Sequence, residues 1–252
     1  MRLLRAQRGV WMAVMAVGLI LTAGCATGPH ANPKDPLEPM NRSISRFNDA
    51  LDDNVLKPVA TGYQNATPEL VQKGVRNVFN NLSDIWSTVN NALQLKGRDT
   101  AESLMRSVVN TVFGIYGIFD VATEIGLERH PEDFGQTLGA WGVPDGPYLV
   151  LPLFGPSTLR DTAGMPVDTS VDVVRQLDHI PTRNSAMTLR VVDKRANLLK
   201  AGNMLSEASI DKYSFTRDAY LQYRRSQIYD GNPPEVEDLP DYSGESRESP
   251  SP

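Results

Sequence analysis

The sequence has little of what enzymes and metal-binding proteins use. It contains one cysteine and three histidines in 252 residues. One cysteine cannot form an internal disulfide, and His30, His130 and His179 have no partner at the spacing of a metal-binding motif. The GxSxG turn, the phosphate-binding loop and the dinucleotide-binding fingerprint are also missing. We therefore expect no enzyme, no catalytic residues, no metal site and no cofactor.

Basic residues are too few and too dispersed for a nucleic-acid-binding protein. Lysine and arginine number 25 against 30 aspartates and glutamates, which gives a formal net charge of −5. Phosphate neutralisation, which drives nucleic-acid binding, has no source here. The acidic residues are also scattered. We expect them to lie on a solvated helix face rather than to pair for acid/base work, and they include Glu132, Asp133, Asp161, Asp168 and Asp172.

No apolar run is long enough to be a membrane span, which needs about 20 residues. Residues 10–21 form a short apolar stretch after Arg2, Arg5 and Arg8, as in a signal peptide. Thr-Ala-Gly-Cys follows at 22–25, and this pattern is typical of a bacterial lipobox. We expect a signal peptide at 1–24 and lipidation of Cys25, which would explain an unpaired cysteine in a secreted chain. The alternative is an ordinary signal peptide that ends near a buried cysteine.

Both ends of the mature chain are poor in apolar residues. Four prolines between residues 26 and 39 predict an extended tether, which we assign to residues 25–35. Residues 231–252 are rich in proline and acidic side chains, which predicts a disordered tail. The folded region is therefore expected at 36–230, a length that fits one domain.

Helical periodicity dominates the folded region and predicts an all-α protein. A long helix is expected from Thr67 to about Gly97, with one apolar stripe. The stripe has two interpretations, because a core helix and a helix lying against lipid share the same pattern. Its members are Val71, Val75, Val78, Leu82, Ile85, Val89 and Leu93. Further helices are expected at about 40–62, 100–113, 118–126, 166–177, 184–205 and 207–229.

The segment 135–156 is unusual because it is apolar and yet holds five glycines and four prolines. Its unpaired backbone amides cannot face hydrocarbon without protection. The segment therefore either packs against the fold or forms a hairpin that faces or gates lipid. Tyr148 to Leu151 is the only convincing strand in the sequence.

Three tyrosines recur on the expected last helix, at Tyr213, Tyr220 and Tyr223, beside several arginines. Amphipathic aromatic residues next to basic ones suit a membrane interface. The same tyrosines can instead close the core with their hydroxyls pointing outward, and spacing does not separate the two.

Three segments together resemble the MlaA (VacJ) family of outer-membrane lipoproteins. The first is Asp-Pro-Leu-Glu-Pro-Met-Asn-Arg at 35–42, followed by Phe47-Asn48. The second is Phe-Gly-Gln-Thr-Leu-Gly at 134–139 with Trp-Gly-Val at 141–143, and the third runs from Gly146 to Asp161. The similarity covers most of residues 35–229. Pro39 and Met40 depart from the family pattern.

The resemblance implies a ring-like helical domain embedded in one leaflet of the outer membrane, on its periplasmic face, with an amphipathic channel. Members of the family associate with a trimeric porin and pass mislocalised phospholipid from the outer leaflet to a soluble periplasmic carrier, which maintains lipid asymmetry. The rival hypothesis is a structural lipoprotein that scaffolds envelope proteins without moving lipid.

Matching motifs carry roles to two groups of residues. Asn41, Phe47 and Asn48 are expected on an N-terminal helix beside the channel. We expect Gly139, Gly142 and Gly146 to act as hinges, because glycine tolerates large backbone changes. The channel wall and its mobile hairpin are assigned to Phe134, Gly139, Trp141, Gly142, Pro144, Gly146, Tyr148, Pro152 and Phe154.

Overall fold

The computed structural model describes residues 32–209 and 211–234. The expected signal peptide, Cys25 and nearly all of the expected tail lie outside these residues. The described part is mostly helical, as expected, with two short strands. Among the described residues, none of the helices combines the length and the hydropathy that a membrane crossing requires.

The first helical run is continuous in direction but changes its winding once. It consists of α2 (Glu38–Leu51), a π-helical turn (Asp52–Leu56) and α3 (Lys57–Ala66). Pro58 explains the turn, because proline has no N–H to donate to the carbonyl four residues earlier. Instead, Lys57 N donates to Asp52 O, which is the wider π spacing.

The fold also begins before the expected boundary at Pro36. The side chain of Asp35 is fully buried, and Tyr213 Oη donates to its carboxylate. The last residue assigned to the tether is therefore part of the core.

Helices α4 (Glu69–Leu93) and α5 (Gly97–Val112) form an antiparallel pair with an inverted distribution of side chains. The polar face of α4 is buried and its apolar stripe is exposed or half-buried, so the core-helix interpretation of this stripe is wrong. Asn81 Nδ2 donates to Thr111 Oγ1 at 2.9 Å between the two helices. The buried polar residues of α4 are Gln72, Asn81, Asp84, Ser87, Asn90 and Asn91.

The glycine- and proline-rich segment is more regular than expected. It contains α7 (Phe134–Ala140) and a hairpin of β1 (Tyr148–Leu151) and β2 (Gly155–Thr158), after the single-turn α6 (Val121–Glu124). The strands are antiparallel, with Tyr148 opposite Thr158 and Leu151 opposite Gly155. The strand at Tyr148–Leu151 is thus confirmed, whereas α7 and β2 were not predicted.

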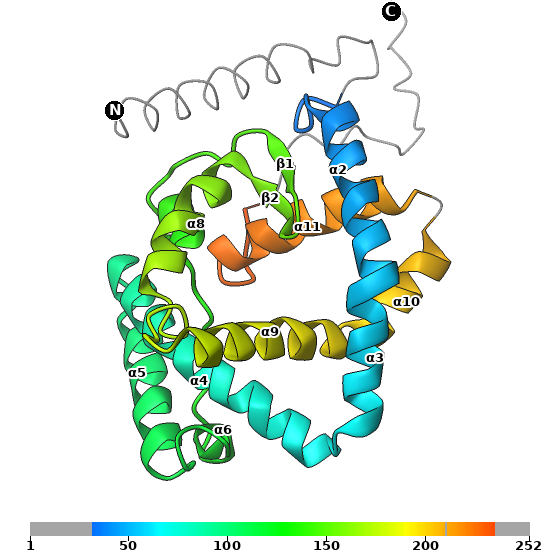
Figure 1. The fold of residues 1–252 in the computed structure, drawn as a ribbon. Coiled ribbons are helices and arrows are strands. Elements are labelled where there is room, and N and C mark those ends of the chain that lie inside the picture. The colour runs from blue at the N-terminus through cyan, green and yellow to red at the C-terminus, as the bar shows by residue number, and fades with distance from the viewer. Residues whose placement is uncertain (1–31, 210, 235–252) are drawn as a thin grey trace, which may run out of the picture.

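Four further helices complete the chain: α8 (Leu159–Val171), α9 (Ile180–Asn197), α10 (Leu199–Ala208) and α11 (Lys212–Ile228). Figure 1 shows the elements following one another around a ring-like frame. In this view α2 and α3 form one side, α4 and α9 the base, and α5 and α8 the opposite side. Helix α11 and the two strands lie across the top.

Apolar cores among the described residues are small. One joins Ala60 of α3 to Ala196 and Leu199, and another joins Tyr148 and Val150 of β1 to Tyr213 of α11. Much of what is buried elsewhere is polar, and many large apolar side chains are exposed. A water-soluble protein normally shows the reverse.

Candidate functional site

Asn41 joins the N-terminal helix to the hairpin. Its side chain is fully buried on α2. Asn41 Nδ2 donates to Tyr148 O at 2.9 Å, and Val150 N donates to Asn41 Oδ1 at 2.9 Å. The amide therefore pairs with one edge of β1 as a neighbouring strand would.

Asn48 repeats this arrangement further along the same strand. Its Nδ2 donates to Leu151 O, and Leu153 N donates to its Oδ1, both at 2.9 Å. Seven helical residues span about 10.5 Å at 1.5 Å per residue. Three strand residues span about 10 Å, so the two asparagines on α2 match the spacing of the strand. The structure places Asn41, Phe47 and Asn48 on α2, with both asparagines bonded to the hairpin and Phe47 exposed. Their expected position beside a channel stays a prediction.

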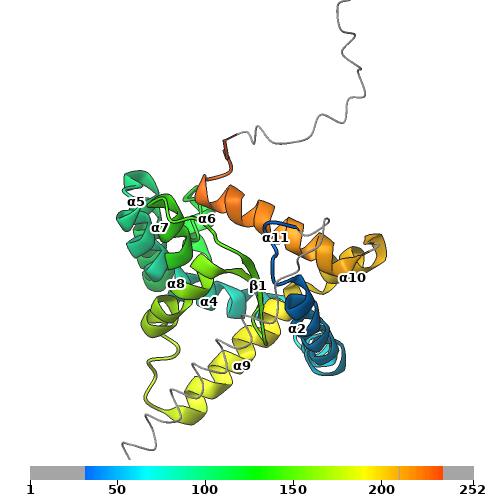
Figure 2. The ribbon, with the colours of Figure 1, turned by 90° about the horizontal axis from the view of Figure 1, so that it is seen from above.

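The tip of the hairpin is apolar and exposed. Leu153 and Phe154 are 66% and 62% exposed, and Pro152 beside them is also exposed. Leu153 and Gly155 have positive φ angles of 69° and 82°, which produce the tight reversal. Both views place the strands between α8 and α2 (Figures 1 and 2).

In contrast, the base of the hairpin is fixed in the core. The ring of Tyr148 is 1% exposed and lies 6.3 Å from that of Tyr213 and 6.2 Å from that of Tyr220. Tyr213 Oη donates to Asp35 and Tyr220 Oη donates to Asp161. Two of the three tyrosines thus close the core with hydroxyls that point at buried acids, while Tyr223 is exposed.

Helix α7 places Phe134 and Trp141 against each other at its two ends. Their rings meet edge to face, with centroids 6.2 Å apart. Trp141 Nε1 donates to Leu93 O at 3.0 Å, which attaches α7 to the end of α4. Phe134 N donates to Asp168 Oδ1 at 2.9 Å. Asp133 is the N-cap of this helix, and its carboxylate accepts from Gln136 N.

A cavity of about 410 Å³ adjoins Asp168, between α4, the end of α8 and α9. Its walls include Ile85, Trp86 and Val89, and an ion pair closes one edge at 2.5 Å, between Arg190 Nη2 and Asp172 Oδ2. Burial raises the pKa of Asp168, although Trp86 Nε1 and Phe134 N donate to it. The cavity therefore combines hydrocarbon walls with charged groups.

A buried ionic network fixes the segments on either side of the hairpin to α11. Arg224 Nε donates to Asp161 Oδ2 at 2.8 Å, and Arg224 Nη1 donates to Asp133 Oδ2 at 2.7 Å. Arg160 binds Asp161 and also Asp145, on the loop before β1. Burial raises the pKa of Asp161, but the hydrogen bonds and charges of Arg224 and Arg160 together outweigh it and the net pKa is lowered.

The expectation that these acids form a solvated face is wrong. Asp161 and Glu132 are both buried, and each binds a cation. The sequence did carry one signal, since Arg217 and Arg224 are spaced by seven residues on one helix and each needs an anion when buried.

The three expected hinge glycines do not share one conformation. Gly142 and Gly146 have φ angles of +88° and +67°, whereas Gly139 lies inside α7. A Cβ at Gly139 would lie 2.9 Å from Arg160 Nη1 and 3.0 Å from Ile228. Gly139 therefore permits close packing, and only Gly142 and Gly146 have the backbone of a glycine turn. Pro144, between them, is exposed.

One group with metal-binding geometry was not apparent from sequence spacing. Glu102, Glu128 and His130 place their ligand atoms within 4.8 Å of one another. The hydrogen bond of His130 and that of Arg98 lower the pKa of Glu102 to about 2. Glu102 therefore stays ionised, and Arg98 already balances its charge in an ion pair at 2.8 Å.

Comparisons with known proteins agree with the geometry. A family model described as MlaA lipoprotein matches residues 33–227. The intermembrane phospholipid transport system lipoprotein MlaA of Escherichia coli is 35% identical over 217 residues, which are 84% of this chain and 86% of that protein. Its namesake in Haemophilus influenzae is 32% identical over 232 residues, which are 88% of this chain and 92% of that protein.

A solved structure shares the fold as well. The solved chain is described under "Structural basis for maintenance of bacterial outer membrane lipid asymmetry", and this protein superposes on it with a TM-score of 0.68 at 33% identity. The match covers 79% of this chain and 99% of that one. The family model spans nearly all the described residues and the relatives match over most of their length, so this chain belongs to the MlaA lipoprotein family.

Proposed function

We propose that this protein removes mislocalised phospholipid from the outer leaflet of the outer membrane through an amphipathic path inside the ring of helices. A lipid anchor on Cys25 holds it in the inner leaflet, beside a trimeric porin. The phospholipid passes to a soluble periplasmic carrier. The protein thereby maintains lipid asymmetry and breaks no covalent bond.

The observation that carries the proposal is the inverted distribution of side chains. Apolar residues of α4 and α5 are exposed where hydrocarbon can cover them, and the asparagines and charged pairs lie inside. A phospholipid headgroup needs polar partners on its way across an apolar layer. The relatives named for phospholipid transport support the same conclusion.

The hairpin is the element that we assign to gating. Its base is held by Tyr148 and by Asn41, whereas its tip carries exposed Leu153 and Phe154. A fixed base and exposed apolar side chains at the tip suit an element that contacts acyl chains. Gly142 and Gly146, in the segment before the hairpin, supply the backbone freedom.

The test is to purify the mature protein in mild detergent and to quantify co-purified phospholipid by mass spectrometry. The hairpin variant replaces Leu153 and Phe154 with serine, and the matched control replaces the exposed Phe215 of α11 with serine. Deleting residues 139–146 would be less informative, because it removes the end of α7 and Asp145, which binds buried Arg160.

We expect phospholipid on the parent and on the control, and clearly less on the hairpin variant at equal yield and elution volume. Absence of phospholipid from all three proteins would favour the scaffold hypothesis instead. Release of free fatty acid would indicate a hydrolase and contradict the proposal in a different way.

A further inference from the structure

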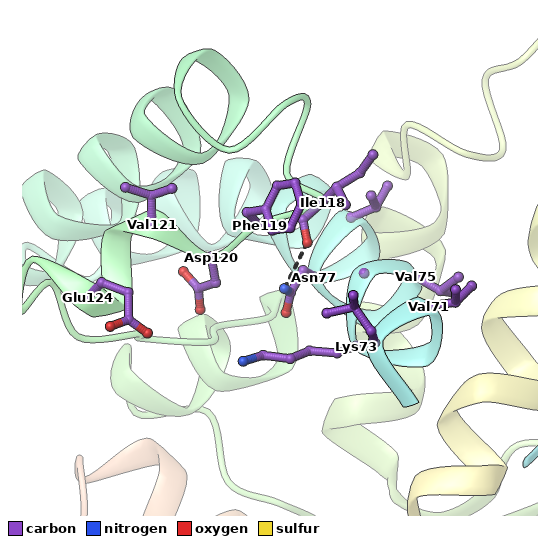
Figure 3. A pocket seen from close by; sticks show the side chains of 12 residues that line it. Val71, Lys73, Val75, Asn77, Ile118, Phe119, Asp120, Val121 and Glu124 are labelled. Atoms are coloured by element: carbon purple, nitrogen blue, oxygen red, sulfur yellow. Dashed lines mark hydrogen bonds between the residues drawn. The ribbon is translucent and has the colours of Figure 1, made fainter. Parts of the chain in front are cut away.

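An apolar groove lies where the first half of α4 meets the segment from Ile118 to Glu124 (Figure 3). Its volume is about 600 Å³. Gly74 allows the two segments to approach, because a Cβ there would lie 3.3 Å from Ile118 Cγ2. Asn77 Nδ2 donates to Ile118 O at 2.9 Å and holds the segment in place. The groove is therefore a built feature of the fold.

One side of the groove is hydrocarbon. Val71, Ile118 and Phe119 line it and remain substantially exposed to solvent. Exposed apolar surface of this kind is stabilised when another apolar group covers it. The groove does not include the hairpin or any residue assigned to gating.

Two charged side chains border the groove and lie on the same side of it. Figure 3 shows the ammonium end of Lys73 directed toward the side of the groove that carries Glu124 and Asp120. Asp120 is already bound by Arg106 Nη2 at 2.9 Å. The ion pairs found among the described residues include neither Lys73 nor Glu124. Lys73 and Glu124 can therefore bind a ligand's charged groups beside an apolar surface.

We propose that this groove binds a phospholipid with an ethanolamine headgroup, with one acyl chain along Val71 and Phe119. Lys73 binds the phosphate, and Glu124 binds the primary ammonium, because charge-assisted hydrogen bonds of both signs are then satisfied. A glycerol headgroup lacks the cation, and a choline headgroup cannot donate a hydrogen bond. The site holds lipid at the protein's exposed surface and does not depend on a path through the ring.

The first measurement locates the lipid. A Val71→Trp variant of the mature protein, in detergent, is titrated with phosphatidylethanolamine brominated on its acyl chains. Bromine quenches tryptophan on contact, so we expect saturable quenching at residue 71. Val191→Trp is the matched control, because Val191 is an equally exposed valine on α9 that does not line the groove. Both variants must elute as the parent does.

The second measurement tests the headgroup contacts in the Val71→Trp background. Glu124→Gln should weaken binding of the ethanolamine lipid about tenfold and leave the glycerol lipid unchanged. Lys73→Gln should weaken both lipids, because both carry the phosphate. The two variants therefore distinguish the contact of Glu124 with the ammonium from the contact of Lys73 with the phosphate.

Three results would overturn the proposal. Equal quenching at residues 71 and 191 would mean that lipid only partitions into the micelle. Equal affinity for all headgroups in the parent would remove the role of Glu124. If a trimeric porin changed the fluorescence of the tryptophan at residue 71 and brominated lipid caused no saturable quenching, the groove would be a protein-docking surface. None of these results changes the outcome of the hairpin comparison, so the two proposals fail independently.

Discussion

At the scale of single residues, side-chain amides substitute for a missing strand. Strand β1 has β2 on one edge, and on the other edge Asn41 and Asn48 each supply one donor and one acceptor. Buried backbone groups must be paired, so these two residues satisfy an edge that would otherwise be left open. They also transmit any movement of α2 to the hairpin.

Replacement of Asn41 by alanine should destabilise the protein by about 3 kcal/mol, since each buried polar group left without a partner costs about 1–3 kcal/mol. The groups affected are Tyr148 O, Val150 N and the carboxylate of Asp35. Denaturant unfolding of the purified protein in detergent measures the loss. Asn54→Ala is the control, because Asn54 is exposed and its amide only binds Ala50 O in its own helix. Similar losses in both variants would show that Asn41 is not special.

The Asp161–Arg224 pair should make stability depend on pH below the usual carboxyl range. The folded-state pKa of Asp161 is lowered from its usual 3.8. The pair therefore contributes its full stability above that value and loses it as the pH falls through the lowered pKa. Glu132 and Asp168 have raised pKa values, and their effect on the pH dependence of stability has the opposite sign. The contribution of Asp161 must therefore be measured as the difference in unfolding free energy between the parent and a variant.

We accordingly expect Asp161→Asn to be less stable than the parent by about 2 kcal/mol or more near neutral pH. The gap should narrow as the same unfolding experiment is repeated at pH values progressively below 3.8, because the carboxylate takes up a proton first in the unfolded and then in the folded parent. A gap that stays constant over this series would mean that the charge of Asp161 contributes nothing.

At the scale of elements, the sequence predicted the long periodic helices well and their ends poorly. Helix α8 was expected at 166–177, with Pro166 at a position that proline tolerates, the first turn of a helix. The helix begins instead at Leu159, where Thr158 Oγ1 accepts from Asp161 N, and Pro166 lies inside it. The capping pair Thr158 and Asp161 was the available signal. Similarly, α9 begins at Ile180, four residues before the expected start, with His179 as its N-cap.

The hairpin and α7 could be foreseen only in part. Strand β1 shows the expected apolar run, but β2 reads Gly-Pro-Ser-Thr and has no strand propensity. Its pairing with β1 comes from tertiary contacts of buried Ser157 and Thr158. Likewise, α7 contains two glycines, which propensity disfavours. A Cβ at Gly135 would lie 2.7 Å from both Arg224 Nη2 and Asp161 Oδ1, so the buried ion pair is what requires this glycine.

Alanine at Gly142 and Gly146 should weaken lipid removal from the outer leaflet. Both positions have positive φ, so each substitution adds roughly 1 kcal/mol of backbone strain. Gly146 also meets Leu159, because a Cβ would lie 3.0 Å from that of Leu159. The readout is detergent sensitivity of cells that carry the double variant at normal protein level.

Gly62→Ala is the matched control for this experiment. Gly62 lies in helix α3 with open space around it, so alanine should be tolerated there. Unchanged detergent sensitivity of the Gly142→Ala, Gly146→Ala variant would remove these two residues from the gating proposal.

At the scale of the whole molecule, periodicity revealed a stripe but not what the stripe faces. The seven apolar positions on α4 are spaced as expected, and their spacing is the same for a core helix and for a helix against lipid. The opposite face of α4 distinguishes the two kinds of helix, because six polar residues there are buried and bonded within the fold. The buried partners come from distant segments, such as Arg129 on Asp84 and Thr137 on Asn90, and local patterns do not show them.

The exposed face of α5 should contribute to membrane binding. Leu104, Val108 and Val112 are exposed and lie one helical turn apart. Serine at all three should weaken binding of the delipidated protein to phospholipid vesicles at least tenfold, since each buried methylene contributes about 0.8 kcal/mol. Vesicle flotation measures the change. Alanine at exposed Asn184, Ser185 and Thr188 of α9 should have no such effect, and equal binding by the two variants would contradict a membrane-facing role for α5.

The inverted surface also constrains how the protein reaches its destination. A chain with an apolar exterior and a polar interior is stabilised by a membrane, but in water it exposes a large apolar surface. Copies that met in transit would bury these faces against each other and aggregate. We therefore expect delivery to depend on a partner that covers the apolar surface until the membrane replaces it.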